Sequence, residues 1–204
     1  MKSALNYGLW AVVLLLVYMV YDSIDSKITF QKATEYRNSI VIEQLKDIRV
    51  AQLAFKSVNE NYANSFKELI EFVKNDSFIV IKALGAVPDT LSEEEAVQMG
   101  LVTRDTSNVS VRDSIFSPRY LKGHLKPFFI DSLPYIPFGR NGEAFVFEAG
   151  EIWKSRMMVQ VFKVFASYGV IYSGLNTKNE DIDIEDGLQV GSMNDPSTSG
   201  NWGE

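Results

Sequence analysis

The chain of 204 residues has no cysteine and a single histidine, His124. Without cysteine it forms no disulfide, uses no thiol nucleophile and carries no lipid on a cysteine. One histidine excludes a histidine pair and a multi-histidine metal site within one chain. His124 lies in the polar segment Lys122–Lys126, so we expect an ordinary solvated histidine in a surface loop.

Charged residues are missing from Ala4 to Tyr21, and no proline occurs before Pro88. About 18 helical residues, rising about 1.5 Å each, nearly match a hydrocarbon layer of about 30 Å. Residues 1–21 are therefore predicted to be a transmembrane anchor in contact with the lipid bilayer. The bulky end of this run, Tyr18 to Tyr21, is unlike a signal-peptide cleavage site and favours a retained anchor. The alternative is a buried core helix of a soluble protein.

The net charge of −6 is concentrated at the C-terminal end of the chain. Residues 177–204 hold seven acidic residues and one lysine, and they are predicted to form an acidic polar tail that is extended or disordered. The neutral remainder offers no basic face, which argues against a nucleic-acid partner. Trp202 is either a docking contact or an exposed residue on a loose tail.

An apolar stripe follows the anchor. Within residues 22–58, apolar residues recur at spacings of three and four, which predicts a stalk and packing helix. The first half is thinly apolar and is expected to be an exposed stalk, whereas the half after Ile40 is rich enough to pack against a domain. Val41, Ile48 and Phe55 follow a heptad spacing, so a coiled coil is an alternative, although Gln52 interrupts it.

Residues 59–176 are predicted to form an α+β globular domain. Ser65 and Glu68 have the spacing of a capping box and mark a second, short helix. Residues 78–84 predict a strand, residues 90–99 a further helix, residues 109–115 a short strand or a turn, and residues 117–126 a loop.

The clearest turn signal is Asn141-Gly142, which predicts a hairpin between residues 135–138 and residues 144–149. A turn near residues 150–155 and a strand over residues 159–165 would complete an antiparallel meander. The predicted fold class is α+β, with a long N-terminal transmembrane-plus-stalk helix packed on a small antiparallel sheet with short helices.

Two neighbouring segments carry a resemblance to a known family. Residues 47–56, DIRVAQLAFK, and residues 59–69, NENYANSFKEL, resemble the junction after the long N-terminal helix in type IV pilin-like and type II secretion pseudopilin-like proteins. The resemblance implies an antiparallel sheet after this helix. The chain departs from the family after Gly8, because residues 9–13 contain no glutamate. The layout is pilin-like without the processing motif, and assembly into a polymer is not implied.

No chemistry-bearing motif accompanies this layout. The chain has no phosphate-binding glycine loop and no Gly-x-Ser-x-Gly elbow, and Asp181, Asp183, Glu185 and Asp186 lack the spacing of a calcium loop. We therefore predict no enzyme, no cofactor and no metal site.

The predicted function is that of a single-pass membrane-anchored envelope protein, a structural or assembly component with other envelope proteins as partners and with oligomers possible. The expected location is a bacterial inner membrane, with the domain in the periplasm. The predicted partner contacts are Val41, Ile48, Phe55 and Trp202. The alternative is a membrane-tethered ligand-binding or sensory domain, whose pocket would be lined by Phe128, Phe129, Tyr135, Phe138 and Trp153.

Overall fold

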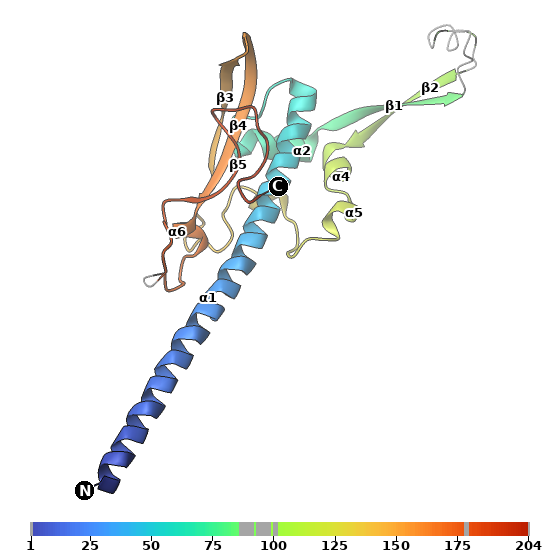
Figure 1. Cartoon of the computed structure of the whole chain (residues 1–204). Helices are drawn as coiled ribbons and strands as arrows, with labels where there is room; N and C mark the ends of the chain where they lie inside the picture. Colours follow the sequence, from blue (N-terminus) through green and yellow to red (C-terminus); the bar gives the residue numbers. More distant parts are fainter. Residues whose placement is uncertain (1, 86–91, 93–98, 100–101, 178–179, 204) are drawn as a thin grey trace.

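One long helix organises the fold. The computed structural model describes residues 2–85, 92, 99, 102–177 and 180–203. Helix α1, Lys2–Asn59, is about 87 Å long at about 1.5 Å per residue. Its N-terminal half extends away from every other element, and the remaining elements surround its C-terminal half (Figure 1). The prediction of an α+β fold with a long N-terminal helix and small antiparallel sheets is confirmed.

The core forms along the C-terminal half of α1. Val41, Leu45, Ile48 and Ala51 are fully buried, and Phe55 is 5% exposed. These residues recur at three- and four-residue spacings, so they share one face of the helix. Helix α2 and strand β5 pack against this face. The predicted apolar stripe is therefore the central layer of the domain's own core.

Helix α2, Phe66–Asn75, begins at the predicted capping box. The Ser65 hydroxyl accepts a hydrogen bond from the backbone N–H of Glu68 over 3.3 Å, and the Glu68 carboxylate accepts one from the backbone N–H of Asn64 over 2.8 Å. These bonds satisfy donors that a helix N-terminus leaves unpaired. Leu69, Phe72 and Val73 then face the core.

A two-stranded ribbon projects from the body. Strand β1, Ser77–Gly85, pairs antiparallel with β2, Val102–Ser110, in the register Ser77↔Ser110 to Gly85↔Val102. Figure 1 shows the ribbon directed away from α1. The predicted strand over residues 78–84 is confirmed. Of the predicted helix over 90–99, only residues 92 and 99 lie within the described part of the chain.

Short helices follow the ribbon. They are α4, Val111–Ile115; α5, Pro118–Leu121; and the 3-10 turn η1, Ile130–Ser132. Residues 109–115 thus contain the end of a strand and a helical turn. The predicted loop over residues 117–126 contains α5, which Ser117 caps by accepting a bond from the backbone N–H of Tyr120.

The second sheet has the order β3–β4–β5 and is antiparallel. Strand β3, Val146–Lys154, and β4, Met157–Ser167, are joined by Ser155 and Arg156, both at positive φ. The predicted turn near residues 150–155 is wrong in position, because residues 150–154 continue β3. The Asn141-Gly142 reversal joins one isolated bridge, Tyr135↔Ala144, instead of two long strands.

The C-terminal region belongs to the domain. After α6, Tyr168–Ile171, strand β5, Gly187–Gly191, joins the edge of β4, with Leu188 and Val190 buried. The prediction of an extended or disordered end is wrong for Gly187–Gly191, which form a strand paired with β4. A short apolar segment, Gly187–Gly191, lies between acidic residues and supplies enough buried surface to complete the sheet.

Candidate functional site

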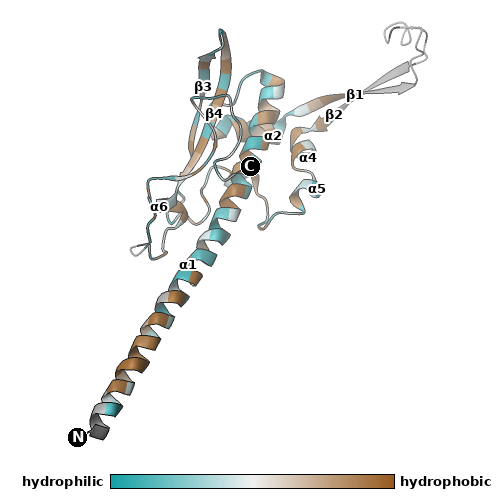
Figure 2. Ribbon diagram, in the orientation of Figure 1, coloured by the Kyte–Doolittle hydropathy of each residue, from teal (hydrophilic) through white to brown (hydrophobic). Residues whose placement is uncertain are grey.

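The N-terminal half of α1 exposes a continuous apolar surface. Every large apolar side chain from Tyr7 to Tyr21 is exposed, by between 40% for Val13 and 76% for Tyr7. Figure 2 shows this hydrophobic segment on the part of the helix that no other element covers. By length and composition, α1 is the one helix among the described residues that could cross a membrane. Exposed apolar surface on this scale requires a nonaqueous environment or a partner.

Three of the four predicted partner contacts lie inside the domain. Val41 and Ile48 are 0% exposed and Phe55 is 5% exposed, and the Phe55 ring meets that of Phe72 at a centroid distance of 5.0 Å. They pack against elements of the same chain, so in this structure they are core residues and offer no surface to a separate partner. The three residues have heptad spacing because they share the face of α1 that is buried in the domain core.

The fourth predicted contact, Trp202, docks on its own chain. Its half-buried ring packs against the core, and the Lys46 ammonium lies 6.0 Å from the ring centroid. Its indole Nε1 is buried without a hydrogen-bond partner within the described residues. The backbone beside it is held by Asn201, whose N–H donates to the Gln189 carbonyl over 3.1 Å. Trp202 therefore packs the C-terminal segment against the domain.

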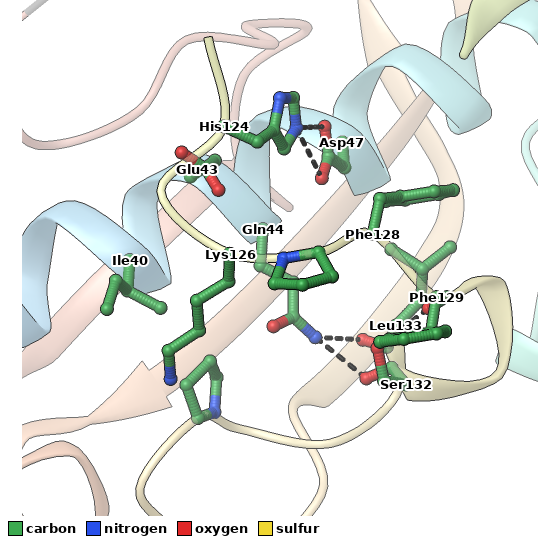
Figure 3. Close-up of a pocket in the computed structure, with 12 residues that line it drawn as sticks. Ile40, Glu43, Gln44, Asp47, His124, Lys126, Phe128, Phe129, Ser132 and Leu133 are labelled. Carbon is green, nitrogen blue, oxygen red and sulfur yellow. Dashed lines mark hydrogen bonds and ion pairs between the residues drawn. The ribbon is translucent and has the colours of Figure 1, made fainter. Parts of the chain in front are cut away.

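A buried polar cluster joins α1 to the segment after α5. Asp47 on α1 is 3% exposed. It accepts a hydrogen bond from Tyr120 Oη over 2.9 Å, and His124 Nε2 lies 3.0 Å and 3.1 Å from its two carboxylate oxygens. Figure 3 shows both contacts, in which Nε2 donates when Asp47 is ionised, because an ionised carboxylate only accepts. The prediction of a solvated histidine is wrong, since the His124 side chain is 11% exposed.

Burial dominates the electrostatics of this cluster. It raises the pKa of Asp47 above the ordinary 3.8, and the hydrogen bonds from His124 and Tyr120 act in the opposite direction. Burial and then the charge of Asp47 raise the pKa of Tyr120. A second carboxylate, Glu43, accepts the backbone N–H of Leu125 over 2.8 Å. The carboxylates thus fasten residues 120–125 to α1.

A small cavity lies beside this cluster. Its volume is about 80 Å³, and Gln44 reaches into its wall to donate to the carbonyls of Ser132, Leu133 and Tyr135 over 2.8, 3.0 and 2.9 Å (Figure 3). Pockets for small molecules usually enclose about 300–1,000 Å³. The polar groups around this cavity serve mainly to hold the loop, and its volume is too small for a ligand of ordinary size.

The aromatic residues predicted for a ligand pocket do not converge. Phe128 and Phe129 border the small cavity, but Phe129 is 65% exposed. Tyr135 is 53% exposed, and Trp153 is 69% exposed near the end of the β3–β4 hairpin. The Phe138 ring lies under the cations of Arg37 at 4.9 Å and Lys126 at 4.2 Å. The five residues therefore do not line one common pocket.

No protein family, curated protein or solved structure matches the chain. Among the described residues, no group of three or more histidine, aspartate or glutamate side chains is arranged to hold a metal ion. The feature with the clearest functional consequence is therefore the contrast between the two halves of α1.

Proposed function

We propose that this protein is a single-pass membrane-anchored envelope protein whose helix α1 holds an α+β domain at the bilayer surface. The observation that carries the proposal is the division of one continuous helix. Its segment from Tyr7 to Tyr21 is apolar and exposed, whereas from Ile40 onward one face is buried in the domain core. A lipid bilayer provides the apolar surroundings that the first segment lacks within the chain.

The proposed role is structural, as a component of an assembly with other envelope proteins. The pilin-like layout of a projecting helix followed by a domain with an antiparallel sheet supports this role, and the bacterial inner membrane with a periplasmic domain is the proposed location. The proposal includes membrane anchoring but not pilin-type processing, because Leu9 to Val13 contain no acidic residue. No catalytic step is proposed.

The alternative of a ligand-binding or sensory domain receives less support. The five aromatic residues predicted to line its pocket do not meet in one place, and the cavity that Phe128 and Phe129 border encloses only about 80 Å³. Cross-linking in native membranes followed by mass spectrometry separates the two roles. A stoichiometric protein neighbour supports assembly, whereas a chain recovered alone with a bound small molecule supports the alternative.

Anchoring is tested by fractionation of the full chain. We expect the chain to stay with membranes after alkaline washing and to keep its N-terminal residues by mass measurement. Leu16→Arg places a charge near the middle of the apolar segment, at a cost of about 3 kcal/mol for insertion, and should increase the extractable fraction.

Tyr36→Arg is the matched control, because Leu16 and Tyr36 are both 54% exposed on the same helix. It lies beyond the apolar segment and should leave membrane attachment unchanged. Recovery of the unmodified chain in the aqueous extract, or equal release of both variants, would contradict the proposal.

A further inference from the structure

Strand β1 has the sequence of an interior strand but lies at the edge of a sheet. Alternation places Phe78 and Val80 on one face of the ribbon and Ile79 on the other. Strands that are apolar on both faces are typical of the middle of a sheet. Among the described residues, β1 pairs with β2 alone, and Ile79 is 70% exposed.

Within the part of the chain that the structure describes, the outer edge of β1 offers unpaired backbone groups. The Asp76 carbonyl accepts the Val111 N–H over 3.0 Å, so the backbone of Asp76 faces the β2 side of the ribbon. Backbone direction alternates along a strand, so Phe78 and Val80 also face β2, and the N–H and C=O groups of Ser77, Ile79 and Ile81 face outward. Such an edge is a template for another strand.

We propose that a second copy of this chain pairs with this edge through its own β1, antiparallel and with the two-fold axis at Ile79. This register sets Ile79 opposite Ile79 of the second copy and Phe78 opposite Val80. It also sets Asp76 opposite position 82, where the sequence has lysine. The two-fold axis produces this opposite-charge pair twice, and β1 becomes an interior strand of a four-stranded sheet.

Charge complementarity selects the register. Shifting the pairing by two residues, the smallest shift that keeps the outward groups bonded, places Val80 or Leu84 opposite Asp76. Asp76 is also the C-cap of α2, where a negative charge faces the negative end of the helix dipole. A cation from the second copy would offset this repulsion. The inference goes beyond the proposed membrane role and does not rest on it.

Cysteine chemistry tests the contact, because the full chain has no cysteine of its own. Directly opposed residues of a hydrogen-bonded antiparallel pair have Cα atoms about 5.5 Å apart, within the range for a disulfide. Under mild oxidation of the purified full chain in detergent, we expect Ile79→Cys to form a covalent dimer at least about tenfold faster than Asn108→Cys. Asn108 lies opposite Ile79 on the same ribbon and is also exposed.

Charge reversal then tests the register in the Ile79→Cys background. Lys82→Glu should slow dimer formation, and adding Asp76→Lys should restore it. The matched control combines Lys82→Glu with Asp105→Lys, which puts opposite charges at positions 82 and 105, paired in the register of the ribbon, but leaves two carboxylates opposed between copies. This control should stay slow. Equal rates for Ile79→Cys and Asn108→Cys, or restoration by Asp105→Lys instead of Asp76→Lys, would overturn the proposal.

Discussion

The side chain of Gln52 forms two hydrogen bonds with the backbone of Ala63, one in each direction. Its Nε2 donates to the Ala63 carbonyl over 3.1 Å, and its Oε1 accepts the Ala63 N–H over 3.0 Å. Gln52 is 0% exposed, so both bonds are shielded from water. They hold the segment that leaves α1 against the helix and explain why a polar residue interrupts the apolar stripe.

Replacing Gln52 should therefore be costly. Gln52→Leu keeps the volume roughly constant but leaves the Ala63 N–H and C=O buried without partners, and we expect the free energy of unfolding to fall by about 2–4 kcal/mol. Denaturant unfolding of the full chain in detergent measures this change. Gln31→Leu is the control, because the Gln31 side chain donates to the Glu35 carboxylate at the exposed surface of the same helix. A similar loss in both variants would contradict the role assigned to Gln52.

Asp47 should make stability depend on pH. Since burial raises its folded-state pKa above 3.8, the folded chain binds a proton more tightly than the unfolded chain. This stabilising contribution is fully present below pH 3.8 and is lost as pH rises through the folded pKa. Asp47→Asn cannot titrate, so the stability of the wild type relative to this variant should decline over that window and then level off.

Tyr120→Phe sharpens this test. The Tyr120 hydroxyl bonds to Asp47 over 2.9 Å and lowers its pKa, so removing the hydroxyl should extend the window to higher pH. The measurement is denaturant unfolding at a series of pH values for all three chains. A difference between the wild type and Asp47→Asn that does not vary with pH would refute this account.

The turn between β3 and β4 should become more stable when its two residues are replaced by residues that favour positive φ. Ser155 and Arg156 have φ values of 50° and 67°, a region where side chains are disfavoured and where Asn-Gly is preferred. We expect Ser155→Asn combined with Arg156→Gly to raise the free energy of unfolding by about 1 kcal/mol. Glu151→Gly, within β3, should instead lower it by about 0.5–1 kcal/mol. Equal effects of both glycines on thermal unfolding would argue against this backbone explanation.

Trp202 and Gly200 should act as a coupled pair. A Cβ atom at Gly200 would lie 2.3 Å from the Trp202 ring, so Gly200→Ala must displace the indole. Trp202→Ala should lower stability by about 1–2 kcal/mol, below the value for a fully buried tryptophan. In the Trp202→Ala background, Gly200→Ala should lower the free energy of unfolding by less than it does in the wild type, as measured by a double-mutant cycle. Additive effects would show that the two positions are independent.

Local signals in the chain predicted local structure well. The Ser65 cap, helix α2 and strand β1 were all predictable, because each depends on residues only a few positions apart. The β3–β4 turn was predicted a few residues too early, because Ser-Arg is not a usual pair for positive φ. Asn141-Gly142 is a usual pair and yet joins only one bridge, with positive φ at Gly142 alone of the two. Turn chemistry indicates where a chain can reverse, and sheet packing decides where long strands form.

The partner-contact prediction shows the same limit. A stripe at spacings of three and four predicts one buried face but does not say what buries it, and here the chain's own domain covers Val41, Ile48 and Phe55. The pairing of Asp47 with His124 joins residues 77 positions apart, and no spacing in the sequence indicates it.

By itself, the sequence determined that the first helical segment is too apolar to be stable in contact with water alone. It also determined that this helix continues with one apolar face. Both follow from hydropathy and periodicity, which are properties of neighbouring residues. Only the tertiary structure decided that β5 completes the sheet, that His124 is bonded to a buried carboxylate, and that among the described residues β1 pairs on one edge alone. These outcomes depend on which distant segments meet, and that choice follows from the burial of the whole core.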